Sequence, residues 1–315
     1  MRLTALAPAA DQAQAIATVW QAMFWPNVAI YVAVLAALAW ALWRRRAASV
    51  ETPESQARHA RNWTRALLGW TIFIAAVLTA YTALSFVQDR HRLAHAPGAL
   101  RVRITSKQWW WSVEYLDPDP SRQVATANEL HLPLGRMTRI ELLSGDVIHS
   151  LWIPALNGKQ DLIPGRTTEL ALTPRAVGRY LGQCAEFCGL QHAHMVLPVT
   201  VESPTAFATW LDAQRAPGAA PASPSAERGK QLFESGPCAM CHAIAGTSAD
   251  SHAGPDLTHI ASRPLLAAGA LPNDRAHMAA WLSDPQAHKP GTNMPDPRLQ
   301  PQEVSDLTDY LEGLR

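Results

Sequence analysis

Two long runs without a charged residue lie near the N-terminus, and they restrict the fold of this chain more than any other feature. The first covers residues 12–43 and the second residues 66–87. Because a helix rises about 1.5 Å per residue, about 22 residues span roughly 33 Å, the thickness of one hydrocarbon core. A buried core helix also lacks charge, but here two such runs lie close together with charged flanks. We therefore predict, within residues 1–97, two transmembrane helices at about residues 18–43 and 66–87.

Arginines around the two runs predict the orientation of this hairpin in the membrane. Six of them lie between the runs: Arg44, Arg45, Arg46, Arg58, Arg61 and Arg65. The N-terminal tail contains only Arg2 as a basic residue. By the positive-inside rule the connecting loop is cytoplasmic, so both termini and everything after Val87 are expected on the periplasmic, outer face of a bacterial inner (cell) membrane. Residues 1–17 lack the apolar core of a secretory signal peptide, so either the first run directs export or a leader is missing from this numbering.

The charge balance limits the partners of this chain. Its formal net charge is +1, so no excess of positive charge points to a nucleic acid. Hydrophobic residues make up 48% of the chain and charged residues 17%, which favours association with a lipid bilayer. We therefore expect a bilayer as partner and no nucleic acid.

Residues 98–203 consist of short segments of β-forming residues instead of long apolar runs. These segments are Leu100–Thr105, Glu129–Leu132, Thr138–Leu143, Thr168–Leu172 and Val196–Val201. Glycine and proline separate them, as they do in turns. The pattern predicts an all-β sandwich or Greek-key barrel of about a hundred residues.

The last part of this region concentrates side chains that bind metal ions. They are Cys184, Glu186, Cys188, His192 and Met195, with His149 upstream. Thiolates, imidazoles and a thioether form a soft donor set that suits copper, and a second cysteine four residues after the first permits two thiolates to bridge two copper ions. A Cys184–Cys188 disulfide and a zinc site with two cysteines and two histidines are the alternatives. His194 competes with His192 as a ligand, and spacing does not decide between them.

A c-type haem motif lies in the last part of the chain. Residues 204–226 are expected to be a linker, since their second half is rich in alanine and proline, and residues 227–315 a third domain. This domain contains Cys238-Ala-Met-Cys241-His242, and C-x-x-C-H is the attachment signature of c-type haem. The two thiols bond the vinyl groups, and the histidine takes one axial position. A thioredoxin-like motif is the alternative for a bare cysteine pair, but the adjoining histidine argues against it.

The second axial ligand of this haem is expected tens of residues later, on a loop. Met294 is the best candidate because Pro295 favours a non-helical loop, and Met278 and His277 are its rivals. Apolar residues recur at helical spacing over residues 301–314. The domain resembles a small class I cytochrome c, which implies an all-α fold.

The cysteine segment resembles subunit II of the haem–copper cytochrome c oxidases, whose binuclear copper (CuA) motif is C-x-E-x-C-x3-H-x2-M. Every position of that motif is filled here. The resemblance implies a cupredoxin-like sandwich with these copper ligands: Cys184 and Cys188 as bridges, His149 and His192 with one copper each, and Met195 as a weak ligand. It also implies that the backbone carbonyl of Glu186 is a ligand, and that its side chain reaches a magnesium ion at the interface with subunit I.

Two further segments resemble the same family, and one family feature is missing. Residues 108–112 resemble the family's aromatic cluster over the copper centre, which implies that Trp109 takes up electrons. Alternate aromatic residues on a strand also commonly fill a core. Residues 161–166 resemble a segment near the interface with subunit I. The glutamate that often precedes the Trp-Thr pair at the second helix has no counterpart before Trp63-Thr64, so we assign no proton-pathway role to this region.

The order of the three domains resembles the fused subunit II of caa3-type cytochrome c oxidases. The resemblance implies an electron-input subunit, in which electrons pass through haem c and the copper pair to subunit I, where oxygen becomes water. The implied partners are oxidase subunit I, other oxidase subunits, and as donor a soluble or membrane cytochrome c or an upstream quinol-oxidising complex. Two alternatives stay open: the CuA-bearing input subunit of a nitric oxide reductase, and a membrane-tethered copper-binding or assembly protein.

Overall fold

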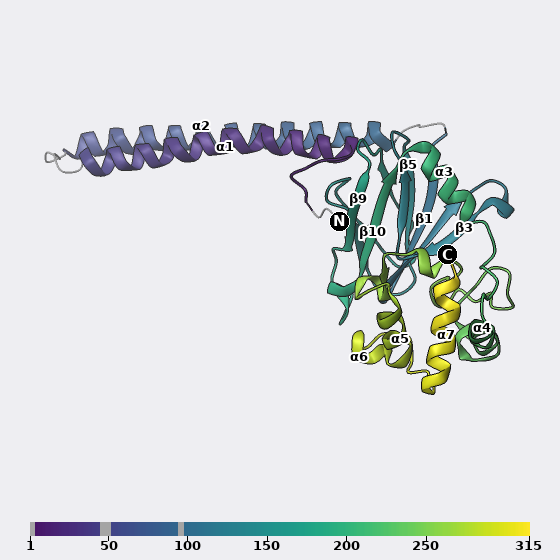
Figure 1. Cartoon of the computed structure of the whole chain (residues 1–315). Helices are drawn as coiled ribbons and strands as arrows, with labels where there is room; N and C mark the ends of the chain where they lie inside the picture. The colour runs from purple at the N-terminus through teal and green to yellow at the C-terminus, as the bar shows by residue number, and fades with distance from the viewer. Residues whose placement is uncertain (1–3, 45–51, 94–97) are drawn as a thin grey trace. The chain divides into compact units, whose positions relative to one another are not determined.

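The chain forms two compact units. The computed structural model describes residues 4–44, 52–93 and 98–315 (Figure 1). One unit is Thr18–Pro97, and the other combines Met1–Ala17 with Gly98–Arg315.

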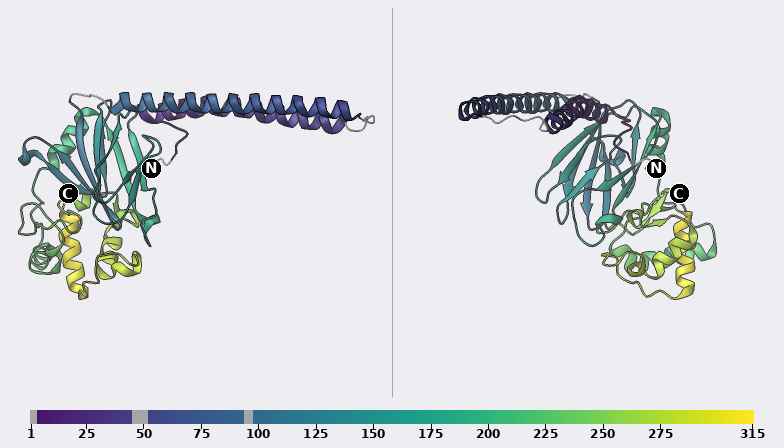
Figure 2. Two further views of the ribbon diagram at one scale, coloured as in Figure 1. Left: turned by 180° about the vertical axis from the view of Figure 1, so that it is seen from behind. Right: turned by 90° about the vertical axis from the view of Figure 1, so that its left-hand side faces the viewer.

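The first unit is formed by two long helices. α1 is Asp11–Arg44 and α2 is Pro53–Leu93, and they run side by side in both views of Figure 2. Both are apolar and long enough to cross a membrane, and no residue of their apolar stretches is buried. Apolar side chains exposed all round a helix of this length fit a lipid environment. The two predicted membrane helices are confirmed. They begin earlier than expected, because the polar residues ahead of each apolar run also favour a helix.

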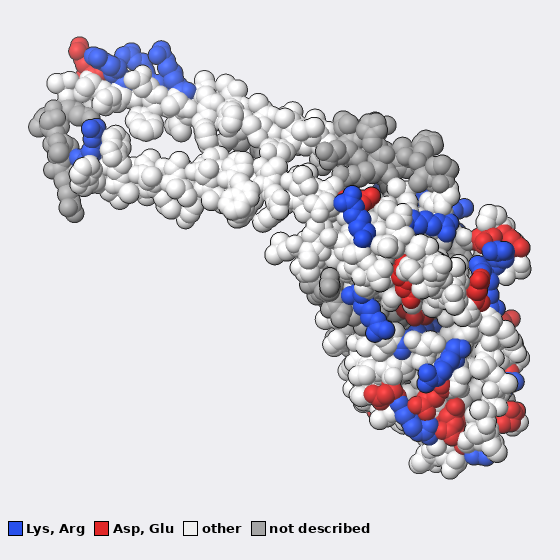
Figure 3. Space-filling model, turned by 45° about the horizontal axis from the view of Figure 1, so that its top comes forward, with Lys and Arg blue, Asp and Glu red and all other residues white. Residues whose placement is uncertain are grey.

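Most charged side chains described for the hairpin lie at the end where α1 finishes and α2 starts. Figure 3 shows Lys and Arg with acidic atoms there, and uncharged side chains along the middle of both helices. Arg44 closes α1, and Arg58, Arg61 and Arg65 lie in the first turns of α2. The prediction that this end is cytoplasmic rests on these residues.

A proline inside α1 is accommodated by a contact between the two helices. Pro26 has no N–H, so the carbonyl of Ala22 one turn earlier lacks its helical partner. The hydroxyl of Tyr81 in α2 donates a hydrogen bond to this carbonyl oxygen at 3.4 Å. Because the bilayer core supplies no water to a freed carbonyl, a side-chain donor takes its place.

The second unit contains a β-sandwich of two five-stranded sheets. The first sheet has the order β3 (Val124–Ala127), β2 (Trp110–Leu116), β1 (Leu100–Lys107), β5 (Thr138–Ser144) and β8 (Thr168–Leu172). The second has the order β4 (Leu130–Pro133), β10 (Val196–Glu202), β9 (Gly178–Cys184), β6 (His149–Trp152) and β7 (Lys159–Leu162). The predicted all-β sandwich is confirmed. β2, β3, β6, β7 and β9 are strands beyond the five expected segments.

The sandwich core follows from the alternation of side chains along its strands. Every second residue of β1 is buried, the period of a strand with one face on a core. β1 pairs antiparallel with β2 and parallel with β5, and β10 pairs parallel with β4 and antiparallel with β9. Trp111, Tyr180 and Ile104 are among the largest fully buried side chains between the sheets.

Residues ahead of α1 pack on the sandwich. The backbone N–H of Ala9 donates to the carbonyl of Ala155 at 2.7 Å, and the N–H of Arg175 donates to the carbonyl of Ala9 at 2.7 Å. Ala10 is fully buried and forms an isolated bridge with Pro174. The N-terminal tail therefore belongs to the sandwich, which its sequence did not indicate.

The segment 204–226, expected to be a linker, begins with a helix. α3 (Pro204–Ala213) is capped by Ser203, whose hydroxyl accepts a hydrogen bond from the N–H of Ala206. Trp210 of α3 stacks on the ring of His131, with centroids 4.0 Å apart. The following residues lack helix and strand, and the N–H of Gly218 donates to the carbonyl of Ala245 at 2.8 Å. This stretch therefore lies against the C-terminal domain.

The C-terminal part, residues 224–315, is called the helical domain below. Its helices are α4 (Pro224–Ser235), α5 (Arg275–Ser283), α6 (Pro285–His288) and α7 (Pro301–Gly313), and it contains the short strands β11 (Leu265–Leu266) and β12 (Leu271–Pro272). The second unit also contains short 3-10 turns. Those in the sandwich are η2 (Pro120–Arg122) and η3 (His192–His194), and those in the helical domain are η4 (Pro237–Met240), η5 (Ile260–Ser262) and η6 (Ala267–Gly269).

Helices α4 and α7 pack closely in the helical domain. Phe233 of α4 contacts Tyr310 of α7 edge-on, with ring centroids 6.2 Å apart. At the crossing, a Cβ atom added to Gly229 would lie 2.1 Å from the carbonyl oxygen of Asp306. Only a glycine permits this approach of two helix backbones. The expected helical domain is confirmed.

Candidate metal and cofactor sites

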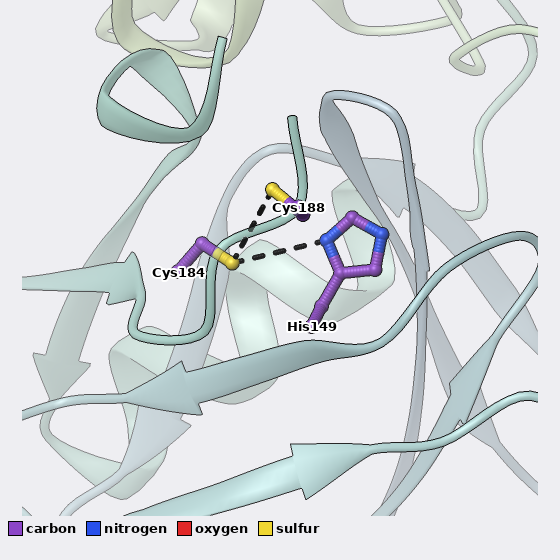
Figure 4. A group of neighbouring side chains, drawn as sticks. All are labelled: His149, Cys184 and Cys188. Atoms are coloured by element: carbon purple, nitrogen blue, oxygen red, sulfur yellow. Dashed lines mark hydrogen bonds between the residues drawn. The ribbon is translucent and has the colours of Figure 1, made fainter. Parts of the chain in front are cut away.

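Two cysteines and two histidines form a compact cluster at one end of the sandwich. The Sγ atom of Cys184 lies 3.7 Å from the Sγ atom of Cys188 and 3.8 Å from Nδ1 of His149, as Figure 4 shows. On the other side, the Sγ atom of Cys188 lies 3.6 Å from Nδ1 of His192. The four side chains therefore lie in a row, with the two thiols in the middle and one imidazole at each end. A disulfide needs about 2.05 Å between the sulfur atoms, and all four cysteines are free.

The second sheet holds this cluster in place. His149 opens β6 and Cys184 closes β9, and these strands are neighbours in the sheet. Residues 184–195, called the cysteine loop below, are fastened at both ends. The N–H of Cys184 donates to the carbonyl of Met195 at 3.0 Å, and the N–H of Ala185 donates to the carbonyl of Ser150 at 2.8 Å. Met195 itself is fully buried in the sandwich core.

A second layer of contacts orients the cluster. The ring of His149 is within 2.8 Å of Asp146 through Nε2, which turns Nδ1 towards Cys184. The indole N–H of Trp109 and the side-chain amide of Gln108 both donate to the carbonyl of Cys188, at 3.0 and 2.7 Å. The sequence offered no sign that Asp146 and Gln108 serve this role, since only the fold brings them to the loop.

The electrostatics of the cluster favour a metal-binding thiolate. The hydrogen bond with Cys188 lowers the pKa of Cys184 to about 3, and the same hydrogen bond raises the pKa of Cys188, so one proton is held between the two sulfur atoms. Burial alone would lower the pKa of His149. Its hydrogen bonds to Cys184 and Asp146 have the larger combined effect, so the pKa lies above its ordinary value. A metal ion displaces the remaining protons from such donors.

The donor atoms fit copper. One donor atom each from His149, Cys184 and Cys188 lies within 4.8 Å of the other two, and all three residues are buried. His192 adds a second imidazole, and the carbonyl of Glu186 faces the Sγ atom of Cys184 at 3.2 Å. Two thiolates with imidazoles are soft ligands of the kind that copper prefers. The ring of the rival His194 instead pairs with Gln191 at 2.7 Å.

The haem motif lines a cavity of about 600 Å³ in the second unit, within the usual size of cofactor sites. All four residues predicted for haem line it: Cys238, Cys241, His242 and Met294. Nδ1 of His242 lies 2.7 Å from the carbonyl oxygen of Pro255, which leaves Nε2 as the available ligand atom. Burial lowers the pKa of His242 and keeps the imidazole neutral. The rival Met278 also lines the cavity, whereas the ring of His277 is bound to Asp274 at 2.8 Å.

A buried arginine in this cavity fits a group that carries carboxylates. Arg263 is 4% exposed, and its Nη1 atom has no hydrogen-bond partner among the described residues. Its Nη2 atom donates to the carbonyl of Asp256 at 2.7 Å. A haem supplies carboxylates for such a donor, so the cavity fits haem c in volume, in its two thiols and in charge. The sequence did not single out Arg263.

Trp109 connects the two sites. It lines the cavity of the helical domain, and its indole N–H donates to the carbonyl of Cys188 in the cluster. The side chain is 8% exposed. The same residue therefore contacts the backbone of Cys188 and lines the cavity.

Comparisons with known proteins agree with this arrangement. Residues 116–203 match the family described as cytochrome c oxidase subunit II, periplasmic domain, and residues 226–315 match the cytochrome c family. Subunit 2 of the cytochrome c oxidase of Alkalihalophilus pseudofirmus is 30% identical over 322 residues, which cover 99% of this chain and 91% of the relative. The corresponding subunit of Bacillus subtilis is 31% identical over 231 residues, covering 70% and 64%. The solved periplasmic domain of subunit II from Bradyrhizobium japonicum is 31% identical, with a TM-score of 0.36 over 38% of this chain and 97% of that domain.

The fold and the two sites define a membrane-anchored electron-transfer protein that joins a cupredoxin domain to a c-type cytochrome domain. The chain belongs to the cytochrome c oxidase subunit II family. It is the electron-transfer subunit of a haem–copper oxidase, with a periplasmic copper domain, a CuA site and a fused cytochrome c.

Proposed function

We propose that this subunit passes electrons from an external donor through haem c, held in the helical domain, to the copper pair, and from there to oxidase subunit I. The observation that carries the proposal is the position of Trp109, which lines the haem cavity and donates a hydrogen bond to Cys188. When bound, haem c and CuA each supply a one-electron redox centre.

The proposed ligands follow from the contacts of each side chain. The copper pair is assigned to Cys184 and Cys188 as bridges, His149 and His192 at either end, Met195 as a weak ligand and the Glu186 carbonyl as another. Haem c is assigned to the thiols of Cys238 and Cys241 and to the axial atoms of His242 and Met294. A rigid ligand frame needs little rearrangement when an electron arrives, and the sheet contacts at both ends of the cysteine loop provide that frame.

Two finer assignments complete the proposal. The side chain of Glu186 is exposed, which suits a magnesium ion shared with subunit I, because Mg²⁺ is usually bound by one or two carboxylates together with waters. The orientation with both termini in the periplasm is supported by the arginines at the turn end of the hairpin. The proposed donor is a soluble or membrane cytochrome c or a quinol-oxidising complex.

The route is tested with the full chain in detergent, loaded with haem and copper. After rapid reduction by one electron equivalent, haem absorbance is expected to report the electron first and copper absorbance afterwards. Trp109→Phe, which keeps an aromatic ring but removes the N–H donor to Cys188, is expected to slow the second step. Trp210→Phe is the control, since Trp210 stacks on His131 in the sandwich. A copper centre that stays oxidised beside reduced haem contradicts the route.

Met294→Ala is expected to leave haem attached, because both thiols remain, but to open one axial position. The iron then changes from low spin to high spin and binds small ligands, and its potential falls with the loss of the thioether. Optical absorption of the oxidised and reduced protein checks this. An unchanged spectrum in Met294→Ala, together with a changed one in Met278→Leu, would move the ligand to Met278.

A further inference from the structure

A lysine of the helical domain is buried against the sandwich. Lys289 is 2% exposed. Its Nζ atom donates three hydrogen bonds of 2.8 Å each, to the carbonyl oxygens of Trp109, His194 and Ala267. Burial lowers the pKa of this amine to about 7, but only the ammonium form offers an N–H to each of three acceptors, so the carbonyls favour the charged form.

The three acceptors belong to both domains. The carbonyls of Trp109 and His194 lie in the sandwich, one beside the copper cluster and one in the cysteine loop. The carbonyl of Ala267 lies in the helical domain, in η6, where Ala267 and Ala268 have φ of 50° and 55°. Residues other than glycine rarely adopt this left-handed conformation, and where they do, the surrounding structure enforces it. The backbone of η6 thus turns an acceptor towards Lys289.

Neighbouring contacts join the same two segments. The side-chain amide of Gln191 donates to the carbonyl of Pro290 at 2.7 Å, and that of Asn293 donates to the carbonyl of Gln108 at 3.1 Å. A Cβ atom on Gly291 would lie 3.0 Å from the side chain of Leu190. Residues 289–293, which directly precede Met294, therefore rest on the cysteine loop and on the turn between β1 and β2 that carries Trp109.

A buried ion pair adds a second fastening away from this loop. Nε of Arg263 lies 3.5 Å from the carboxylate of Glu129, and both side chains are almost fully buried. Glu129 also accepts a hydrogen bond from Thr126 at 2.7 Å. Because removal of one partner leaves a buried charge unpaired, such contacts fix one arrangement of the two surfaces.

We infer that Lys289 is a positioning residue for electron transfer, because its ammonium group fastens the Met294 loop of the helical domain to the cysteine loop of the sandwich. This inference rests on the proposed route from haem c to copper. Lys289 lines the cavity of the helical domain, but the three hydrogen bonds of its Nζ atom all go to backbone carbonyls. It acts by holding the cavity of the helical domain at a fixed distance and orientation from Cys184 and Cys188, while one electron leaves haem iron, which is oxidised, and reduces the copper pair.

The test compares Lys289→Met with Lys230→Met in the full chain, in detergent, loaded with haem and copper. Both variants remove one lysine from the helical domain, but Lys230 lies in α4 and, among the described residues, makes no hydrogen bond or ion pair with the sandwich. Haem absorbance and the copper paramagnetic resonance signal report whether each domain is folded. The relaxation enhancement of the copper signal by haem iron reports their separation, and amide hydrogen exchange over residues 189–195 reports the docking.

In Lys289→Met, reduction of haem by an external donor is expected to stay unchanged. The step from haem to copper is expected to slow by about tenfold or more, since three hydrogen bonds from a charged group are lost and the docked population falls. Relaxation enhancement should weaken and exchange over residues 189–195 should quicken, with both spectra unchanged. Lys289→Gln, which keeps two N–H donors, should fall between wild type and Lys289→Met, and it replaces that variant if the helical domain fails to fold.

Equal haem-to-copper rates, relaxation and exchange in wild type and both Lys289 variants would overturn the inference. An equal slowing in Lys230→Met would overturn it too, because charge rather than docking would then be responsible. If wild-type protein shows no transfer from haem to copper at all, the proposed route fails, and the relaxation and exchange measurements alone decide whether Lys289 fastens the domains.

Discussion

Cys188→Ser is expected to abolish the mixed-valence copper signal while the haem spectrum stays unchanged. The Sγ atom of Cys188 stands between Cys184 and His192, at 3.7 and 3.6 Å, and a serine hydroxyl is a hard, protonated oxygen that does not bridge copper. Substitutions in the second shell of metal sites already cost about 10–100-fold in affinity or activity, so the loss of a bridging ligand should reduce electron transfer to subunit I by more than about 100-fold. Electron paramagnetic resonance and copper analysis of the full chain check this.

The control for this prediction also decides between the two histidines of the cysteine loop. His194→Ala should retain the copper pair, because the side chain of His194 pairs with Gln191 and only its backbone carbonyl contacts Lys289. His192→Ala should lose it. Survival of the multi-line copper signal in Cys188→Ser would refute the bridging assignment, and its loss in His194→Ala would transfer the ligand to that residue.

Gly229→Ala is expected to destabilise the helical domain by about 3 kcal/mol, the upper part of the range for overpacked sites. The new Cβ atom would lie 2.1 Å from the carbonyl oxygen of Asp306 and 3.0 Å from the N atom of Leu307. These are backbone atoms, which cannot rotate away, so α4 and α7 have to separate. That separation would also disturb the pair of Arg228 with Asp306, whose atoms lie 2.7 Å apart.

Denaturant unfolding followed by haem absorbance measures this effect, while the copper signal reports the sandwich independently. Gly313→Ala is the matched control, since a Cβ atom there meets nothing within 4 Å at the end of α7. An unchanged midpoint for Gly229→Ala would mean that α4 and α7 do not approach each other as closely as the structure shows.

Short-range patterns in the sequence predict the two apolar helices and the proposed cysteine ligands. The uncharged runs need only length and composition. Cys184 and Cys188 lie four residues apart, and the haem motif occupies the five consecutive residues 238–242. The choice between His192 and His194 depends on the turn η3. The two histidines are only two positions apart, so their spacing from the cysteines does not show which ring faces the thiols. The structure directs His192 to the thiol pair.

Contacts between residues that are far apart in the chain could not be predicted from the sequence. Lys289 resembles any surface lysine, because its three acceptors are backbone carbonyls that carry no sequence signal and lie up to 180 positions away. The packing of Ala9 and Ala10 on the sandwich uses backbone hydrogen bonds of residues that look like a simple tail. The sequence prediction places α3 in the linker, because its proline-led start runs on into the stretch rich in alanine and proline.

The covered position of Trp109 determines how the electron supply responds to its surroundings. A soluble donor that reached this side chain directly would deliver electrons at a rate set by donor concentration and by salt, since charged surfaces attract each other less at high ionic strength. Here the side chain is 8% exposed, and the fused domain that covers it is always present at one copy per copper centre. On the proposed route, the step from haem c to copper is therefore unimolecular. Salt and donor abundance then control only how fast haem c is reduced. They do not control how fast haem c passes its electron to copper.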